Sequence, residues 1–426
     1  MSVPELTAED AASLFIQNHS VVVTAMAASE PGQFFNMASE FFETRNQVIV
    51  YCANPSKPYE IFRRPELLGS LELRPLFLTS NVRDHQSMPH VHYVPQHLSS
   101  WSRNIIDQHH NIDVFWGSCS LPDRRGFVSL GPGVCYESEI LKKSGKIILE
   151  VNPNIPFTHG ATAIPSSIVD AFVHSDLELP EYKTQKPDAT DQKIACYVAD
   201  MIADGSTIQL GIGSIPDALT SELRHKKDLG IHTEMINNSV QKLVEWGVVN
   251  GRYKSIWPDR VVGSFAYGNK SLYEFIHQNP MVEFHPASVI VDPYRIGRNH
   301  RMVSVNSAVE IDLTGQVCSE SVGHLELSGI GGAFDTHTGA QRSGFGTGII
   351  ALKSKTKTGI SKIVSELKPG AKVSISRNDI DTVITEYGVA RLKGQSVAER
   401  AKRLIHISHP EDQDFLSSEA KKHGYI

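Results

Sequence analysis

The chain has 426 residues, more than one ordinary core accommodates, and this length favours two α/β domains of about 200 residues each. Hydrophobic residues make up 40% and charged residues 21% of a chain with a formal charge of −6, so there is no general basic excess for binding nucleic acid. Five irregularly spaced cysteines without a C-x-x-C pair indicate reduced thiols. No apolar run approaches the roughly 18 residues of a membrane span, and the start of the chain lacks the basic region of a signal peptide. We therefore expect a cytoplasmic protein that binds neither membrane nor nucleic acid.

Short runs rich in β-branched residues alternate along the chain with helix-like stretches, which predicts a mainly parallel α/β architecture. These runs include Val21 to Thr24, Gln47 to Tyr51 and Lys146 to Val151. The polar segment from Ser175 to Thr190 contains two prolines and predicts a domain boundary. We predict an N-terminal domain over residues 1–180 and a C-terminal domain over residues 190–426, each an open, mainly parallel sheet flanked by helices.

After this boundary, the sequence predicts a helix from about Thr190 to Gly205, because apolar residues recur there at helical spacing. A short strand follows from Ser206 to Leu210. The next residues are two closely spaced glycines, and then Ser214 and Asp217 at the S-x-x-D spacing of a capping box, which predicts a helix that begins at Ser214 and continues to about Lys226.

A second strand is predicted from Ile231 to Ile236, with His232 and Glu234 on one face. The two strands and the helix between them have the length of a crossover connection between parallel strands. Gly211, Gly213 and Glu234 would then lie where the strands end, which is where α/β proteins bind ligands. Glycine amides and a helix N-terminus stabilise developing negative charge, so a carboxylate beside them has the parts needed for acyl transfer.

Other interpretations of this segment stay open. A glycine pair after a strand is more often a tight turn than an oxyanion site. The same spacing, with an acidic residue about 20 positions later, is also typical of dinucleotide binding. Pro216 replaces the third glycine of that motif and opposes the close helix packing that it requires, which disfavours a NAD-dependent dehydrogenase.

Four further segments carry candidate residues. An H-x-H pattern suggests metal binding, but no Cys, Asp or Glu lies in the segment, which favours a surface loop over a metal site at His90, His92 and His97. The glycine-rich stretch from Ser328 to Gly339 has the composition of either a phosphate cradle or a structural turn.

Alternating lysines follow a strand-like run and would either meet a nucleotide phosphate or form a solvated edge. They are Lys353, Lys355 and Lys357. Glu386 is a rival nucleophile, but nothing comparable to a capped helix precedes it.

At these residues the sequence resembles the acetyl-CoA hydrolase/transferase family, most closely its 4-hydroxybutyrate CoA-transferase branch. The resemblance covers nearly the whole chain. It is carried by ASEP (Ala28 to Pro31), VNPNIPFTHG (Val151 to Gly160), QLGIGSIPDAL (Gln209 to Leu219), HTEM (His232 to Met235), HPASVIVDPYRIGRNHRMVSVNSAVEIDLTGQV (His285 to Val317), SGIGGAFD (Ser328 to Asp335) and TEYGVARLKGQSVAERAKRLI (Thr385 to Ile405).

The resemblance implies the two-domain CoA-transferase fold with the active site between the domains, and Glu234 as the catalytic residue. It also implies CoA contacts from Gly211, Ile212, Gly213, Ser214, Ile215, Ser328, Gly332 and Lys357. Two residues depart from the family pattern. Ala333 stands where glutamine or serine is common, and Thr336 stands where an aromatic residue is usual.

The implied reaction moves CoA between an acyl-CoA and a small carboxylic acid through a glutamyl-CoA thioester. CoA and acyl-CoA are then substrates, and we expect no tightly bound cofactor and no metal. We expect a homo-oligomer, a dimer. An acetyl-CoA hydrolase is the closest alternative, because exclusion of water alone separates the two activities. A non-catalytic acyl-CoA sensor is an alternative of another class, and it predicts an altered nucleophile.

Overall fold

The computed structural model describes residues 3–63, 71–182 and 186–426. The chain forms two compact units, of which unit 1 comprises Met1–Lys183, Glu234–Asn238 and Val262–Ile290. Unit 2 comprises Thr184–Thr233, Ser239–Val261 and Val291–Ile426. The first change of unit falls inside the predicted boundary segment. The chain then returns to unit 1 twice, so Glu234 belongs by its contacts to unit 1 and not to the unit that holds most of the C-terminal half.

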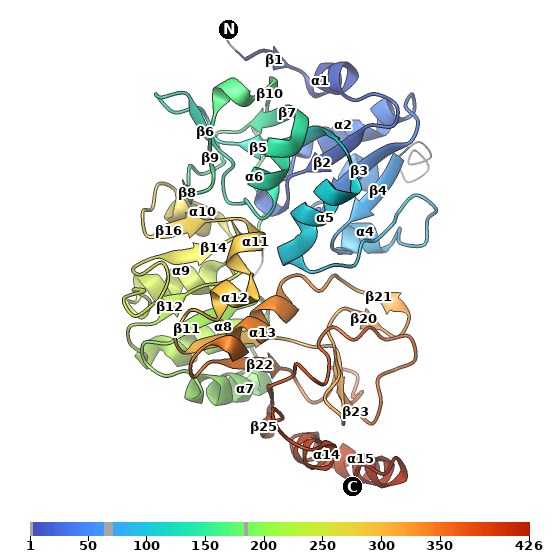
Figure 1. Ribbon diagram of the computed structural model, residues 1–426, viewed down its shortest axis with the longest axis vertical. Coiled ribbons are helices and arrows are strands. Elements are labelled where there is room, and N and C mark those ends of the chain that lie inside the picture. The colour runs from blue at the N-terminus through green and yellow to red at the C-terminus, as the bar shows by residue number, and fades with distance from the viewer. Residues whose placement is uncertain (1–2, 64–70, 183–185) are drawn as a thin grey trace. The chain divides into compact units, whose positions relative to one another are not determined.

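A seven-stranded parallel sheet forms the centre of unit 1 (Figure 1). In sheet order its strands are β1 (Glu5–Leu6), β10 (Ala171–His174), β7 (Ser144–Val151), β5 (Ile112–Cys119), β2 (Val21–Thr24), β3 (Val48–Cys52) and β4 (Leu71–Pro75). Each adjacent pair is parallel. The three β-branched runs of the sequence are β2, β3 and β7, which confirms these strand predictions.

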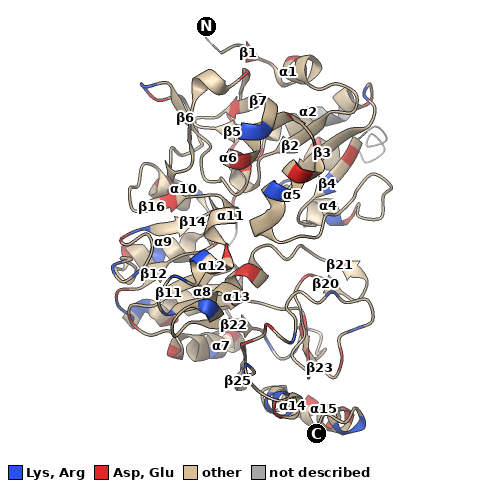
Figure 2. Cartoon of the chain, in the orientation of Figure 1, with Lys and Arg blue, Asp and Glu red and all other residues tan. Residues whose placement is uncertain are grey.

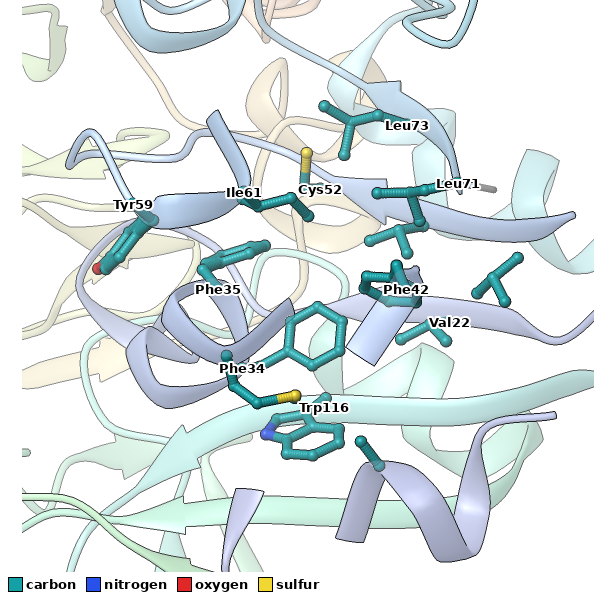
Figure 3. Packing of buried hydrophobic residues seen from close by; sticks show 14 of the residues in the cluster. Val22, Phe34, Phe35, Phe42, Cys52, Tyr59, Ile61, Leu71, Leu73 and Trp116 are labelled. Atoms are coloured by element: carbon teal, nitrogen blue, oxygen red, sulfur yellow. The ribbon is translucent and has the colours of Figure 1, made fainter. Parts of the chain in front are cut away.

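The helices of unit 1 are short. They are α1 (Ala8–Phe15), α2 (Gly32–Phe42), α3 (Glu60–Arg63), α4 (Ser80–Arg83), α5 (Trp101–Gln108), α6 (Glu137–Ile140), α10 (Lys270–Ile276) and α11 (Ala287–Ile290). Helix α2 supplies aromatic rings to the core, as Figure 3 shows. The ring centroid of Phe34 lies 4.9 Å from that of Trp116 on β5, and both side chains are fully buried.

Unit 2 is built on a six-stranded sheet. In sheet order its strands are β12 (Gly230–Ile231), β11 (Thr207–Leu210), β17 (Met302–Asn306), β22 (Thr347–Ala351), β24 (Thr382–Thr385) and β25 (Gly388–Arg391). The first five run parallel, and β25 pairs antiparallel with β24. Each unit therefore has the mainly parallel sheet that the sequence predicts.

Helices flank the sheet of unit 2. They are α7 (Ala189–Asp200), α8 (Ser214–Glu222), α9 (Asn238–Glu245), α12 (Pro293–Ile296), α13 (Ala333–Arg342), α14 (Val397–His406) and α15 (Pro410–Lys422). Helices α7 and α8 pack against each other, and α13 packs on β17 and β22. The predicted helix, strand and helix after the boundary are α7, β11 and α8, within a few residues of the expected bounds.

The remaining strands form small sheets. They pair as β6 (Phe127–Ser129) with β9 (Ala163–Pro165), β13 (Met235–Ile236) with β15 (Phe265–Ala266), β16 (Val282–Phe284) with β8 (His159–Gly160) and β14 (Val261–Gly263), β18 (Glu310–Asp312) with β19 (Val317–Cys318) and β23 (Ile363–Val364), and β20 (Ser321–Val322) with β21 (Leu325–Glu326). Charges of both signs are scattered over both units (Figure 2). Among the described residues, no helix has the length and apolar character that crossing a membrane requires.

Candidate active site

Four neighbouring strands of unit 2 bring polar segments to the carboxyl edge of its sheet. Strand β11 leads into Gly211, β17 ends at Asn306, β22 is followed by Lys353, and β24 is followed by Glu386. The ends lie side by side because the register pairs Leu210 with Val305, Asn306 with Ile350, and Ala351 with Ile384. This edge therefore holds most of the residues that the sequence assigned to CoA.

The loop after β11 bends into α8 at Gly213, which has φ 118° and ψ −178° and occupies the N-cap position. Almost only glycine adopts this conformation, so the second glycine of the loop is required by the turn itself. The side chain of Ile212 is 44% exposed, and the first helical hydrogen bond runs from Asp217 N to Gly213 O at 3.1 Å. The amides at the start of α8 lack acceptors within the helix, which makes the loop a potential anion site.

The helix begins at Ser214 as predicted, but the predicted capping box is wrong. Gly213 takes the N-cap position, and Ser214 Oγ donates instead to Asp191 Oδ1 at 2.9 Å. Asp217 Oδ1 accepts a hydrogen bond from Ser239 Oγ at 3.1 Å. The pattern misled because both side chains have partners from distant segments, and these contacts replace the local pair.

The second glycine-rich segment also leads into a helix N-terminus. Gly332 is buried and occupies the N-cap position of α13, while Ser328 is half-buried and donates its backbone N–H to Glu320 O at 3.3 Å. Asn306 Nδ2 donates to Thr336 Oγ1 at 3.2 Å, which ties the end of β17 to the first turn of α13. Thr336, one of the departures from the family pattern, is therefore a buried structural contact.

Two of the three alternating lysines form ion pairs. Lys353 Nζ lies 2.7 Å from Asp188 Oδ2, and Lys355 Nζ lies 2.8 Å from Glu411 Oε2. Burial lowers the pKa of Lys353, but the hydrogen bonds that its ammonium donates to Asp188 and Asp191 outweigh this effect, and the net shift of the pKa is upward. Lys357 is exposed at the tip of the turn that spans residues 356–360. Of these lysines, Lys357 is the one presented to solvent.

Glu386 holds the same segment in place. Its two carboxylate oxygens accept hydrogen bonds from Ser354 N at 2.9 Å and Ser354 Oγ at 2.6 Å. These contacts give the rival nucleophile a structural role beside β22 and β24.

The candidate nucleophile Glu234 lies in a bend and not within a strand. The predicted strand from Ile231 to Ile236 is split, because β12 joins the sheet of unit 2 while β13 pairs with β15 in unit 1. The backbone oxygen of Glu234 accepts hydrogen bonds from Ser264 N at 2.8 Å and Phe265 N at 3.3 Å. The expectation that His232 and Glu234 share a strand face is therefore wrong.

The residues just before Glu234 are fixed in unit 2. Thr233 Oγ1 donates to Leu210 O at 3.3 Å, and the peptide bond places the Cα of Glu234 about 3.8 Å beyond that of Thr233. His232 is buried, and its Nδ1 lies 3.0 Å from Asn299 Nδ2. Glu234 is partly exposed, whereas every other residue from 231 to 240 is buried.

A nearby thiol is a poor competitor for the nucleophilic role. Burial raises the pKa of Cys135 well above its usual range, and the charges of Glu137 and Glu234 raise it further. Because the thiolate is the reactive form, Cys135 stays protonated and unreactive at neutral pH.

Two polar residues at this edge were not singled out in the sequence. Asp191 is buried at the start of α7, where it forms a capping box with Asp188, and Asn306 ends β17. The D-x-x-D spacing signals the capping box, but no local pattern signals the distant partner Ser214. Within the described part of the chain, no three His, Cys, Asp or Glu side chains gather as metal ligands, and this includes His90, His92 and His97.

Comparison with known proteins gives matches to both halves of the chain. Residues 56–180 match the acetyl-CoA hydrolase/transferase N-terminal domain, and residues 268–420 match the acetyl-CoA hydrolase/transferase C-terminal domain. The 4-hydroxybutyrate coenzyme A transferase of Clostridium kluyveri is 38% identical over 98% of this chain and 97% of its own length. An acetyl-CoA hydrolase of Schizosaccharomyces pombe is 24% identical over 76% of this chain and 70% of its own length.

Solved structures resemble the fold over nearly the whole chain. RipA from Yersinia pestis has a TM-score of 0.94 at 31% identity, covering 99% of this chain and 98% of its own. The 4-hydroxybutyrate CoA-transferase from Porphyromonas gingivalis has a TM-score of 0.83 at 31% identity, with the same coverage. The likeness therefore includes both sheets and every segment assigned to the candidate site.

Proposed function

Because the chain belongs to the acetyl-CoA hydrolase/transferase family, we propose that it is a CoA-transferase in which Glu234 relays CoA from an acyl-CoA to a small carboxylic acid. The proposed donor is acetyl-CoA, and the proposed acceptor is 4-hydroxybutyrate or butyrate. One observation carries the assignment of Glu234. It is the one partly exposed residue in a buried segment, and it follows Thr233, which is bound to the residue before the glycine loop.

The chemistry needs one carboxylate and proceeds in two exchanges. The Glu234 carboxylate attacks the thioester carbonyl, the C–S bond breaks, and a mixed anhydride and CoA thiolate form. The thiolate then attacks the glutamyl carbonyl of the anhydride, which releases the donor's carboxylate and leaves a glutamyl-CoA thioester. The acceptor acid repeats both exchanges in reverse. The thioester's free energy stays in the enzyme-bound intermediate, so the proposal includes no tightly bound cofactor.

The carboxyl edge of unit 2 supplies the groups proposed to bind CoA. The amides at the start of α8, from Gly213 to Ile215, suit the negative charge that develops on the thioester oxygen. The N-terminus of α13, after Ser328 and Gly332, is a second set of donors for pantetheine or phosphate groups. Lys357 has the exposure that a contact to a nucleotide phosphate requires.

Acetyl-CoA hydrolysis is the second candidate, because acetyl-CoA hydrolases are among the relatives. In that reaction water captures the intermediate, and the same nucleophile serves. A sensor that binds acyl-CoA without turnover remains an alternative of another class, and the presence of Glu234 argues against it.

An acid-panel assay tests the proposal. The purified protein is incubated with acetyl-CoA and, separately, with 4-hydroxybutyrate, butyrate, propionate or water alone, and the new acyl-CoA is measured by chromatography. We expect an acyl-CoA product with at least one acid, at a rate well above loss of acetyl-CoA in water. Loss of acetyl-CoA at the same rate with and without acid would establish the hydrolase, and no consumption of acetyl-CoA would support the sensor.

The proposal also includes a cytoplasmic homodimer. Light scattering coupled to size-exclusion chromatography tests the homodimer, because the chain mass is 47.0 kDa and the particle in solution should have twice that mass.

A further inference from the structure

A buried carboxylate joins three segments at the carboxyl edge of unit 2. Asp191 is 1% exposed, and its Oδ1 accepts the hydrogen bond of 2.9 Å from Ser214 Oγ. Lys353 Nζ donates to Asp191 Oδ2 at 3.1 Å and to Asp188 Oδ2 at 2.7 Å. The first turn of α7, the first residue of α8 and the loop after β22 therefore meet on Asp191.

The local sequence supports this arrangement. Asp188 and Asp191 form the capping box of α7, in which Asp188 N donates to Asp191 Oδ2 at 3.0 Å. Asp191 thus receives hydrogen bonds on both oxygens and a cation beside it, which are the conditions under which a buried carboxylate persists. The carboxylate is more fully satisfied than helix capping alone requires, because capping uses one of its oxygens.

The contact also determines what Ser214 can do. Its hydroxyl donates to Asp191, so the side chain anchors the loop, while the backbone N–H belongs to the first turn of α8 and has no acceptor within the helix. Gly213, the residue before it, has a backbone conformation that almost only glycine adopts, and it has no side chain by which the protein could hold it. An anchor at Ser214 is therefore well placed to keep the Gly211 to Ser214 loop in this conformation.

Lys353 also changes the electrostatic potential at the start of α8. Without it, the Asp191 carboxylate would sit 2.9 Å from the first residue of α8 as an uncompensated negative charge. That charge would offset the positive potential at the start of α8 and repel an anionic ligand at the same helix end. The ion pair removes this repulsion while it leaves an acceptor for Ser214.

We propose that Asp191, neutralised by Lys353, is a positioning residue for the CoA-binding loop. It acts through Ser214 and sets the direction of the amides at the start of α8. This inference rests on the proposed function, since it concerns the same loop. A displacement of about 1 Å in such a loop can cost about 100-fold in rate, so loss of the anchor should lower kcat more than it raises KM for acyl-CoA.

A set of variants separates positioning from simple structural support. Ser214→Ala and Asp191→Ala should each lower kcat by roughly 10- to 100-fold, and the double variant should be no worse than the poorer single variant, because both remove one contact. Asp188→Ala, which removes the capping partner but leaves the contact with Ser214, should have a smaller effect on kcat.

Charge compensation gives a second signature. Lys353→Met leaves the buried carboxylate unpaired and should raise KM for acyl-CoA, whereas Lys353→Met combined with Asp191→Asn should recover much of the loss, because asparagine still accepts from Ser214 without a charge. Matched controls lie on the same unit. Lys355→Met removes a neighbouring ion pair, and Glu399→Gln changes the equivalent capping-box carboxylate of α14, away from the loop.

Hydrogen exchange of the peptide covering residues 211–215, measured without ligand, provides a readout that does not depend on activity. We expect this peptide to exchange faster in Asp191→Ala and Ser214→Ala than in wild type, Lys355→Met or Glu399→Gln. Melting temperatures identify any variant that fails to fold. Unchanged exchange and unchanged kcat in folded Asp191→Ala and Ser214→Ala would overturn the inference. If the wild type lacks transferase activity while Asp191→Ala and Ser214→Ala still exchange faster than it does, the proposed function is overturned but the role of Asp191 in holding the loop is supported.

Discussion

Replacing Gly213 with alanine changes the candidate oxyanion loop through its backbone alone. The residue has φ 118° and ψ −178°, a region that side-chain-bearing residues almost never occupy. A Cβ built there meets no atom within 4 Å, so steric packing makes no contribution. The cost is local strain of about 1–3 kcal/mol. Gly211 is the matched control, because its Cβ would meet only Val305 O at 3.9 Å, an ordinary contact, at a backbone conformation open to alanine.

The strain of Gly213→Ala must appear in one of two observables. If the loop keeps its conformation, the free energy of unfolding in urea falls by about 1–3 kcal/mol. If the loop relaxes, the helix-end amides move, and a loss of transition-state stabilisation of that size lowers kcat by roughly 5- to 150-fold. Gly211→Ala should change the free energy of unfolding by less than about 1 kcal/mol. Wild-type stability together with wild-type kcat in Gly213→Ala would refute the reasoning, as would equal destabilisation by the two substitutions.

Three further predictions concern other parts of the chain. Glu234→Asp shortens the proposed nucleophile by one methylene and should lower kcat by about 100-fold or more with an unchanged melting curve; transfer assays check this, and wild-type activity would assign the role elsewhere. Lys357→Ala should raise KM for acyl-CoA, with an effect that shrinks as salt increases, and a salt-independent effect would exclude a screened phosphate contact. Burial raises the pKa of Glu137 from 4.5 to about 7, so the folded protein keeps this proton while the unfolded chain releases it. The free energy of unfolding should therefore fall by about 3 kcal/mol as pH rises from about 4.5 to 7, and Glu137→Gln should flatten this dependence in urea titrations; an unchanged slope would show that Glu137 ionises in the folded state.

Local sequence patterns located the elements that local physics determines. The β-branched run at Val21 to Thr24 is β2 with the predicted bounds, and α8 begins at Ser214 as expected. In the strand, side chains that suit a buried parallel sheet decide the outcome. The helix begins at the predicted residue although its capping box does not form, because the glycine turn at Gly213 sets the same start.

Partners distant in the chain explain what the sequence did not reveal. The run from Ile231 to Ile236 resembles one strand, but its two ends pair in different sheets, and Glu234 lies in the bend between them. Ser214 binds a residue 23 positions earlier, and Lys353 binds one 162 positions earlier. Neither contact leaves a signal in the surrounding residues. The roles of Ser328 and Lys357 came from family resemblance, and they remain predictions.

Chemical trapping of the intermediate tests the central claim most directly. Incubation with acetyl-CoA and no acceptor acid should release acetate and leave CoA attached to Glu234 as a thioester. Borohydride reduces a thioester to an alcohol but spares an ordinary carboxylate, so treatment should inactivate the enzyme and peptide mass analysis should find the reduced side chain at Glu234. Glu234→Gln, carried through the same steps, should show no modification. An unmodified Glu234 in an enzyme that is active in transfer would contradict the carboxylate relay, as would an acetyl group found on a cysteine such as Cys119 or Cys318 when the borohydride step is left out.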